Sequence, residues 1–339
     1  MDILPHRLPT FRANLHAHST CSDGACSPEE LKAFYLSKGI SIVAFTEHEI
    51  IRTHHRLSEP GLFTALVGYE LGFNDVLRVN AEHSPVIHLN LLAKRPELRT
   101  HVNFRPEWCW GTPQIWRTEA LHNGIVHGRT ADAQTINKTI ADANDLGFLI
   151  TLNHPAWSLI PETLLQELRG LWGFEIYNTS ATVNGGSTDA SFLYDSILRA
   201  GNASPFCVAA DDTHLSLPPS HPRCDRGRAW VTLFAPDQEY ASVISALEQG
   251  RFYASTGPEI YRLQQEKTCF LLDCSPVRSV YLRSAGRRVS SVLAPPEGPL
   301  LTSVKLPIKP TMTGPLRLIL TAPDGTQAWT NPIPFPPLS

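Results

Sequence analysis

Several apolar stretches of this sequence end in histidine or carboxylate side chains, and this pattern limits the folds that the chain can adopt. It occurs in residues 14–18, 42–48, 65–70, 149–154 and 208–214. A buried imidazole or carboxylate loses its hydration, so these residues are costly at the ends of buried strands unless something binds them. Barrel-like α/β folds collect catalytic groups at the carboxyl ends of their strands. We therefore expect these side chains to converge on one point.

The sequence up to about residue 260 alternates short apolar runs with helical patterns, which is typical of strand–helix units around a parallel sheet. A helix is predicted to begin at Ser27, which can cap it, with Pro28 in its first turn and Gly39 at its end. Residues 40–45 then form a buried strand. Later residues repeat this alternation, with helices over 137–146 and 191–200 and strands over 148–152, 173–177 and 206–210.

Two regions depart from this rhythm. Residues 96–135 have no clean period and contain Trp108, Trp110 and Trp116, so we interpret them as a functional loop or lid, with a surface excursion as the alternative. The tryptophans either stack on an aromatic leaving group or simply anchor the loop. After about residue 263 the sequence changes to short alternating stretches between prolines and glycines, which predict a small antiparallel β-module with a hairpin turn at Asp324-Gly325.

Charge and composition set expectations about location and partners. The net charge of −3 lacks the basic excess that attracts nucleic acid, so we do not expect a nucleic-acid partner. The amino-terminal residues lack the apolar core of a secretion signal, and no stretch reaches the roughly 18 apolar residues of a membrane span. We therefore expect a cytoplasmic protein with no membrane partner. The seven cysteines fit a reducing compartment, and we interpret Cys21 and Cys26 as free thiols rather than a zinc knuckle.

The histidine pair His16 and His18 gives the first metal-binding signal. On a strand, a spacing of two sends both imidazoles to one face, where they can reach one ion. The pair alone is a weak signal, because surface histidines show the same spacing. Two motifs strengthen it: the turn Ser22-Asp23-Gly24 places a carboxylate just downstream, and His48 follows the next predicted strand.

Together, these motifs resemble the polymerase and histidinol phosphatase (PHP) superfamily of metal-dependent phosphoesterases. The resemblance covers about residues 12–262. It rests on the motifs His16-x-His18, Ser22-Asp23-Gly24, Thr46-x-His48, Gly68-x-Glu70, His154-Pro155 and Asp212-x-His214. Residues 250–258, followed by a β-module with Ala328-Trp329-Thr330-Asn331-Pro332 near its end, are similar to the CehA/McbA-type branch of that superfamily.

The resemblance implies an α/β fold, with a distorted (β/α)7 barrel followed by a small C-terminal antiparallel β-sandwich-like domain. The barrel would occupy residues 1–262, with the lid at about 96–135, and the accessory domain would occupy residues 263–339. The resemblance also implies two to three divalent metal ions at the strand ends. The first would be held by His16, His18, Glu70 and Asp212, the second by Glu70 as a bridge with His88 and His154, and the third by Asp23, His48 and His214.

Some positions in this set stay open. His88 lies in an apolar stretch that reads as a strand, and His83 is its competitor for the second metal. Glu175 is a further ligand or a structural acid, and we favour the structural role. Many members of the superfamily have aspartate where this chain has Glu47, so we expect altered hydrogen bonding around the third metal rather than loss of metal binding. Imidazole and carboxylate ligands without thiolate suit zinc, manganese or iron.

The chemistry implied by the resemblance is hydrolysis by a metal-bridging hydroxide held by Glu70, without a protein nucleophile. His214 is a candidate acid for the leaving group, and a metal-bound water is the alternative. Phosphate groups are commonly bound by an arginine fork. Arg228, just before the apolar run at residues 229–234, is the first candidate for substrate binding, ahead of Arg117, Arg223 and Arg226.

Three functions fit these observations. We expect hydrolysis of a small-molecule phosphoester, such as a nucleotide or sugar phosphate. The same site could instead hydrolyse a carbamate or carboxylic ester, as the CehA/McbA-type resemblance suggests. A non-catalytic metal-binding module is the third reading, although retention of every expected ligand type argues against decay of the centre. The sequence leaves the oligomeric state and the role of the β-module open.

Overall fold

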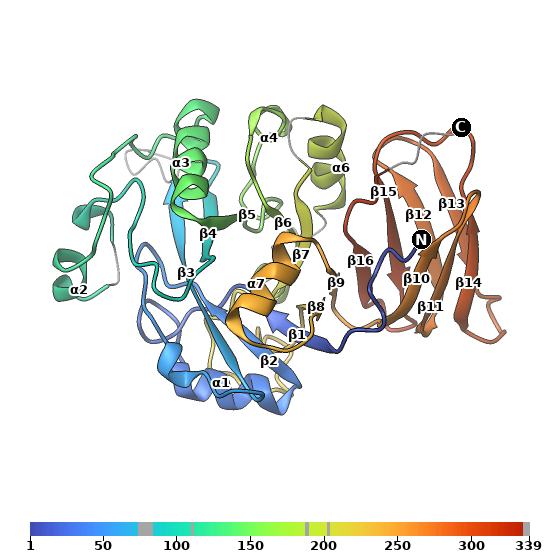
Figure 1. The fold of residues 1–339 in the computed structure, drawn as a ribbon, viewed down its shortest axis with the longest axis horizontal. Helices are drawn as coiled ribbons and strands as arrows, with labels where there is room; N and C mark the ends of the chain where they lie inside the picture. Colours follow the sequence, from blue (N-terminus) through green and yellow to red (C-terminus); the bar gives the residue numbers. More distant parts are fainter. Residues whose placement is uncertain (74–83, 110–111, 187–189, 202–203, 335–339) are drawn as a thin grey trace.

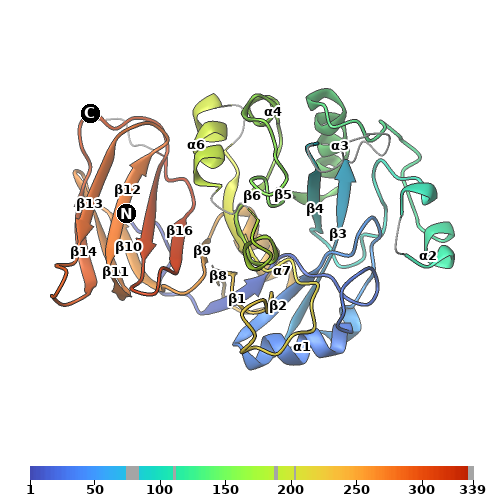
Figure 2. The ribbon, with the colours of Figure 1, turned by 180° about the vertical axis from the view of Figure 1, so that it is seen from behind.

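The computed structural model describes residues 1–73, 84–109, 112–186, 190–201 and 204–334. His83 and Trp110, which the sequence analysis named as candidates, lie outside the described residues. Figure 1 shows a mixed α/β part on the left and a β-rich part, coloured orange to red, on the right. The same division is visible from behind in Figure 2.

Strands in the described part of the chain form two sheets. They are β1 (Thr10–Asn14), β2 (Ile40–Phe45), β3 (Thr64–Phe73), β4 (Ile87–Ala93), β5 (Phe148–Leu152), β6 (Gly173–Asn178), β7 (Phe206–Ala210), β8 (Trp230–Phe234), β9 (Phe252–Ser255), β10 (Ile260–Gln265), β11 (Cys269–Val277), β12 (Ser279–Ser284), β13 (Val289–Leu293), β14 (Leu301–Pro307), β15 (Leu316–Thr321) and β16 (Gln327–Thr330). The larger, 13-stranded sheet has the order β13-β12-β15-β16-β9-β8-β1-β2-β3-β4-β5-β6-β7, and the smaller sheet has the order β10-β11-β14.

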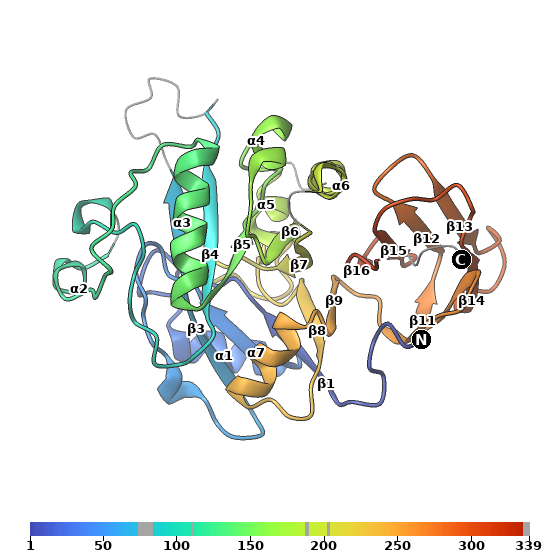
Figure 3. The same ribbon diagram turned by 45° about the horizontal axis from the view of Figure 1, so that its top comes forward.

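Helices cover the α/β part of the large sheet (Figure 3). They are α1 (Pro28–Ser37), α2 (Gln114–Thr118), α3 (Ala133–Leu146), α4 (Glu162–Glu167), α5 (Thr179–Val183), α6 (Ser191–Ala200) and α7 (Tyr240–Glu248), with short 3-10 turns η1 (His55–Leu57) and η3 (Pro106–Trp108). The predicted start of α1 is confirmed, because Ser27 and Glu30 form a reciprocal capping box. Gly147 ends α3 with φ +97°, as its position before a buried strand predicted.

The large sheet is mixed, which corrects the expectation of a parallel sheet. Strands β1, β2 and β3 are parallel neighbours, and so are β5, β6 and β7. Strand β4 runs antiparallel to both β3 and β5. All residues of β4 are buried, and a fully buried strand has the same apolar pattern whether it is parallel or antiparallel. The sequence therefore could not predict the direction of β4.

Backbone hydrogen bonds also join the chain beyond β1 to the chain beyond β7, although these strands lie apart in the sheet order. The amide of Asp212 donates to the carbonyl of His16 at 2.9 Å, and the amide of His18 donates to the carbonyl of Thr213 at 3.2 Å. The two strand ends that carry predicted ligands are therefore fixed to each other. The regular seven-unit barrel stays a prediction, since β8 and β9 extend the sheet on the other side of β1 by antiparallel pairing.

The β-rich part is continuous with the large sheet, because β16 pairs antiparallel with β9. The β-rich part has a hydrophobic core of its own, which contains residues of both sheets, including Leu272 and Leu318. The predicted hairpin at Asp324-Gly325 is confirmed by the antiparallel β15–β16 pair. The amino terminus also packs here: the Ile3 amide donates to Leu263 at 2.9 Å, and Leu4 enters the core. The predicted domain boundary at residue 262 falls within β10 and stays a prediction.

A buried ion pair connects the β-rich part to α6. The Asp195 carboxylate accepts from Arg317 at 2.8 and 3.1 Å and from Arg283 at 2.9 Å. Arg317 is only 1% exposed, so its charge depends on this partner. No helix among the described residues combines the length and apolar character that a membrane crossing requires.

Candidate metal centre

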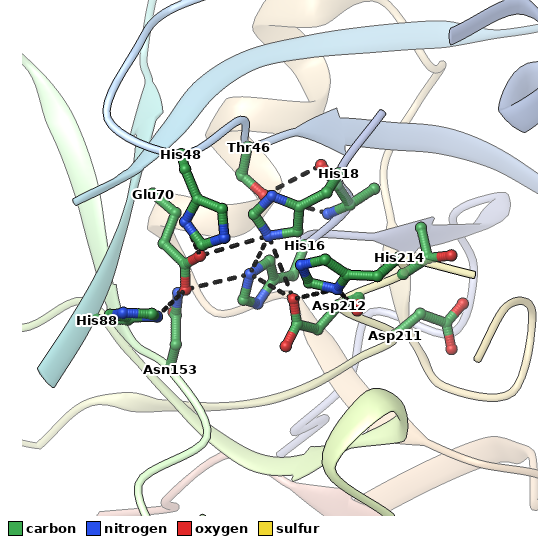
Figure 4. A network of polar contacts seen from close by, with 12 residues as sticks. His16, His18, Thr46, His48, Glu70, His88, Asn153, Asp211, Asp212 and His214 are labelled. Atoms are coloured by element: carbon green, nitrogen blue, oxygen red, sulfur yellow. Dashed lines mark hydrogen bonds and ion pairs between the residues drawn. The ribbon is translucent and has the colours of Figure 1, made fainter. Parts of the chain in front are cut away.

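The predicted ligands meet at one edge of the large sheet. Figure 4 shows those from His16 to His88 together with Asp212 and His214, apart from Asp23. Because the strands that precede them are adjacent or joined at their ends, segments distant in sequence arrive at one place. His16 and His18 follow β1, Asp23 lies in the turn beyond them, His48 follows β2, Glu70 lies in β3, His88 lies in β4, His154 follows β5, and Asp212 and His214 follow β7. The structure therefore brings together all of the predicted ligands.

Glu70 stands at the middle of the cluster and is almost fully buried. Its Oε1 lies 3.0 Å from His88 Nδ1 and 3.4 Å from both His16 Nε2 and His154 Nε2. Asn153 donates to the same oxygen at 2.7 Å and orients the carboxylate. Glu70, His88 and His154 form one compact group whose ligand atoms lie within 4.8 Å of one another.

The other oxygen of Glu70 faces a second set of imidazoles. Oε2 lies 3.0 Å from His48 Nδ1 and 3.3 Å from His18 Nε2. Asp23 lies beyond these imidazoles: its Oδ2 is 3.5 Å from His48 Nε2, and its Oδ1 is 3.5 Å from His214 Nε2. His18, Asp23, His48 and His214 form a second compact group, which adds His18 to the three ligands predicted for one metal.

A third group is made by His16, His18 and Asp212. Asp212 Oδ1 lies 3.1 Å from His16 Nε2 and 3.2 Å from His18 Nε2, and these two nitrogens are 3.1 Å apart. Two imidazole nitrogens and a carboxylate oxygen thus point at the same small volume. His18 belongs to two groups, and Glu70 touches residues of all three, so any bound ions would be neighbours.

The cluster has the properties expected of a site for divalent cations. Asp212 Oδ1 and His88 Nδ1 are buried, and although ion-pair partners lie 3.0–3.2 Å away, neither atom makes a hydrogen bond of normal geometry. Leaving such atoms unsatisfied costs roughly 1–3 kcal/mol each, and a cation between them would remove this cost. All the donors are imidazole nitrogens and carboxylate oxygens, a set that suits zinc, manganese or iron. These residues therefore fit the implied metals.

Glu175 supports the cluster from β6 and matches the structural role favoured for it. Its Oε1 lies 2.7 Å from His16 Nδ1, and its Oε2 accepts from the His154 amide at 2.8 Å and from Asn178 at 3.0 Å. A carboxylate on Nδ1 fixes the tautomer that leaves Nε2 free to bind a cation. Asn178 also donates to Asp212 at 3.2 Å, which ties β6 to the opposite side of the cluster.

Two of the converging residues have strained backbones. His154 has φ +31° and Asp212 has φ +54°, in the left-handed region that residues other than glycine rarely adopt. Each such conformation costs on the order of 1–3 kcal/mol and persists only where surrounding structure holds it. Here the strain turns each side chain inward directly after a buried strand. Its occurrence at these two positions supports a functional origin for the cluster.

Burial and charge act on the protonation of the cluster in opposite directions. Burial lowers the pKa of His48, but the carboxylates of Glu70 and Asp23 outweigh it and raise this pKa to about 10. Burial likewise raises the pKa of Glu70, but His88 and His16 are among the imidazoles that hold it well below its usual range. The carboxylates are therefore ionised near neutral pH, and a cation must displace protons from imidazoles in order to bind.

Glu47, which the sequence predicted to alter hydrogen bonding around the third metal, points into the turn that carries Asp23. Its carboxylate accepts from the Ser19 hydroxyl, from the Ser19 amide at 3.1 Å and from the Ser22 hydroxyl at 2.6 Å. The same turn needs Gly24, because a Cβ there would collide with the backbone of His18. The longer side chain thus makes hydrogen bonds to the turn instead of joining the main cluster.

A cavity of about 520 Å³ opens above the cluster. Its floor consists of predicted ligands, and its walls are mixed in character. Ser180 and Asn184 are polar, whereas Val86, Ala181 and Leu215 are apolar. Trp157 stands at the rim, 46% exposed, with its ring edge-on to His154 at 5.0 Å between centroids. The cavity-lining residues that the structure describes include no lysine or arginine.

The arginines singled out from the sequence make other contacts. Arg228, the predicted substrate-binding residue, donates to the His221 carbonyl at 3.0 Å and does not line the cavity. Arg117 donates to Thr112, and Arg226 donates to Leu217. Of these arginines, Arg223 contacts the cavity wall, because it donates a hydrogen bond to Asn184 at 2.5 Å. Substrate binding by Arg228 thus stays a prediction without a supporting contact.

Trp108 and Trp116, from the predicted lid, pack against arginine side chains and do not line the cavity. The Arg129 guanidinium lies 4.6 Å from the Trp108 ring, and that of Arg52 lies 3.8 Å from the Trp116 ring. These contacts agree with the anchoring alternative for the two residues. Among the described residues, the tryptophan that lines the cavity is Trp157, which the sequence analysis did not identify. Its position three residues after the predicted ligand His154 could have indicated that it lies near the site.

Comparisons with known proteins yield distant structural similarity alone. No protein-family model matches the sequence, and no curated protein matches it. A two-domain protein from Bacteroides vulgatus, described as containing a predicted PHP-like metal-dependent phosphoesterase, is 15% identical with a TM-score of 0.43, and the alignment covers 97% of this chain and 96% of that one. An amidohydrolase from Chromobacterium violaceum with bound sulfate is 18% identical with a TM-score of 0.38, over 62% and 93% of the two chains. Similarity at this level does not assign the chain to a family, and the CehA/McbA-type branch stays a prediction.

Proposed function

We propose that this protein is a metal-dependent hydrolase that cleaves a small phosphate ester. One observation carries the proposal: three groups of imidazoles and carboxylates, linked through Glu70 and His18, lie together beneath one open cavity, and each group contributes residues to its floor. Structural metal sites are usually closed by protein ligands, whereas catalytic sites leave room for water and substrate. A floor of ligands beneath a cavity of about 520 Å³ matches the catalytic kind.

The ions would be held as the three groups suggest, by His16, His18 and Asp212, by Glu70, His88 and His154, and by Asp23, His48 and His214 with His18 at the boundary of two groups. When bound, divalent cations lower the pKa of a coordinated water and neutralise charge on the oxygens of the ester. Glu70 would help to hold the ions on both of its sides, since its two oxygens face different imidazoles. Glu175 would hold His16 in the tautomer that binding requires.

His214 fits the role of a ligand better than that of an acid. Its Nδ1 lies 2.8 Å from the Asp212 carbonyl oxygen, which can only accept, so the ring proton belongs on Nδ1. Nε2 then offers its lone pair toward Asp23 and the cavity. We therefore assign His214 to the metal centre, and the protonation of the leaving group does not depend on it.

The cavity walls indicate the shape of the substrate. Ser180 and Asn184 can hydrogen-bond to a polar group, and Arg223 orients Asn184 from outside. Val86, Ala181 and Leu215 provide an apolar surface, and the exposed Trp157 ring offers a stacking face at the rim. A phosphate ester with an aromatic or nucleoside substituent would use both kinds of wall.

The same walls favour a second candidate, hydrolysis of a carbamate or carboxylic ester. Phosphate groups are commonly recognised by arginine, yet the described lining of the cavity contains no arginine or lysine. A neutral ester needs no such cation, because polarisation of its carbonyl by a metal ion would suffice. Apolar walls around the floor suit an uncharged acyl or aryl group.

A substrate panel with metal reconstitution separates the candidates. The purified protein, stripped with a chelator and supplied with Mn²⁺ or Zn²⁺, would be assayed with p-nitrophenyl phosphate, nucleoside phosphates, aryl carbamates and aryl esters. The proposal predicts that phosphoesters are hydrolysed and that Asp212→Asn abolishes this activity. Turnover of the carbamates or esters alone would favour the second candidate. Absence of all turnover with metal bound would leave a non-catalytic module.

A further inference from the structure

Beside the main centre lies a fourth group of ligand-type side chains that the proposed hydrolase does not use. Cys21, Glu47 and His54 come from the turn after β1, the loop just after β2 and the segment before η1. Their ligand atoms, a sulfur, a carboxylate oxygen and an imidazole nitrogen, lie within 4.8 Å of one another. Glu47 and His54 are buried, and Cys21 is half-buried.

His54 gives an independent reason to expect a ligand here. It is 5% exposed, and its Nε2 is buried without a hydrogen-bond partner. The Glu47 Oε1 atom lies 3.7 Å from this nitrogen, which is beyond hydrogen-bond distance. The His54 ring is fixed against Phe45, with 4.6 Å between ring centroids. A buried imidazole nitrogen therefore lies beside Glu47 and Cys21 without making a hydrogen bond of normal geometry.

The separation between His54 and Glu47 suits a cation held between them, with the Cys21 sulfur within 4.8 Å of both ligand atoms. Zinc binds sulfur at about 2.3 Å and nitrogen or oxygen at about 2.0–2.2 Å, so tetrahedral ligands lie about 3.3–3.6 Å apart. The distance of 3.7 Å between His54 and Glu47 is close to this range. Glu47 Oε1 accepts one hydrogen bond, from the Ser19 hydroxyl, and keeps a lone pair for a metal. The half-buried side at Cys21 leaves a place for water as a fourth ligand.

We propose that Cys21, Glu47 and His54 form a separate mononuclear site for a thiophilic divalent cation such as Zn²⁺. Its thiolate distinguishes it from the main centre, whose ligands are all nitrogen and oxygen, so it favours softer ions than Mn²⁺. The site would brace the turn that carries Asp23, because Ser22 links Glu47 at 2.6 Å to Asp23 at 3.3 Å. Its role is structural and does not depend on the reaction catalysed nearby.

Cobalt substitution tests this site independently of activity. Co²⁺ bound by a thiolate gives a sulfur-to-metal charge-transfer band in the near ultraviolet, and Co²⁺ bound by imidazoles and carboxylates alone does not. The full-length protein, reduced, stripped and titrated with Co²⁺, should develop this band. Cys21→Ser and His54→Gln should each abolish it and bind one Zn²⁺ fewer per chain by elemental analysis.

Two control variants make the result specific. Cys26→Ser removes a neighbouring thiol outside the proposed site, and Asp212→Asn damages the main centre; both should keep the band. The proposal is overturned if the unmodified protein shows no band, or if the band survives Cys21→Ser. Because Asp212→Asn removes the hydrolase but not this site, failure of the proposed enzymatic function and failure of the cobalt site give different outcomes.

Discussion

Replacing Glu175 with glutamine tests how the protein prepares His16 to bind a metal. In the structure Glu175 only accepts hydrogen bonds, from His16 at 2.7 Å, from the His154 amide at 2.8 Å and from Asn178 at 3.0 Å. Glutamine keeps one accepting oxygen and replaces the other with an amide group that only donates. The substitution preserves size, so its effect reports hydrogen bonding rather than packing.

Either orientation of the new amide is unfavourable for metal binding. If its NH₂ faces His16, the imidazole must accept at Nδ1 and carry its proton on Nε2, where a metal would bind. If the NH₂ faces the other way, it meets the His154 amide and Asn178, which are also donors. Disrupting such a supporting contact typically weakens metal affinity 10- to 100-fold, which corresponds to about 1.4–2.7 kcal/mol.

Competition with a chromophoric chelator would measure this change for Zn²⁺ or Mn²⁺. Glu162→Gln is the matched control, because Glu162 lies on α4 and hydrogen-bonds to Ser196 and Gln166, away from the cluster. We expect an unchanged metal dissociation constant for the control and one at least about tenfold higher for Glu175→Gln. Equal affinities for Glu175→Gln and the unmodified protein would refute the reasoning that this carboxylate fixes the tautomer of His16.

Three further predictions concern stability, pH and substrate selection. Asp195→Asn should destabilise the protein by about 3–5 kcal/mol in chemical denaturation, since it leaves the buried charge of Arg317 unpaired. The partly exposed Arg283 provides the comparison: its replacement by alanine should cost less than about 1 kcal/mol, and equal losses would contradict the burial argument. In the metal-free protein His48 has its pKa raised to about 10, so its contribution to stability is complete below its usual pKa of 6.5 and is lost as pH rises through about 10. The melting temperature of the stripped protein should therefore fall between these pH values, and a flat profile would contradict the assignment. Trp157→Ala should raise KM about three- to tenfold for aryl or nucleoside esters and leave it unchanged for methyl phosphate, whereas an equal effect on both would remove the stacking role.

The convergence of the ligands could be predicted from the sequence, because it follows from the cost of burying polar side chains that have no partner. Polar residues such as Glu70 and His154 directly follow or interrupt buried strands, where an unbound side chain would be costly. Neighbouring strands then bring such residues to one edge. The order of the strands was less accessible, since the buried run of β4 carries no sign of its direction and the expected parallel sheet proved to be mixed.

Contacts that depend on tertiary structure were harder to anticipate. The role of Glu175 depends on the arrival of His16 from a strand far away in sequence. Arg228 stands at a suitable place in the sequence, but its side chain turns to the His221 carbonyl. Alternating residues predicted the β-rich part, yet nothing in that pattern indicated that β16 would pair with β9 and continue the large sheet.

Crystals soaked with Mn²⁺ or Zn²⁺ and measured near the absorption edge of the metal would test the central claim most directly. We predict at least two anomalous peaks at the floor of the cavity, with Glu70 oxygens and histidine nitrogens at about 2.0–2.2 Å from the ions. The absence of anomalous peaks from the cavity floor would contradict this prediction. So would ions that bind there without contacting either Glu70 oxygen.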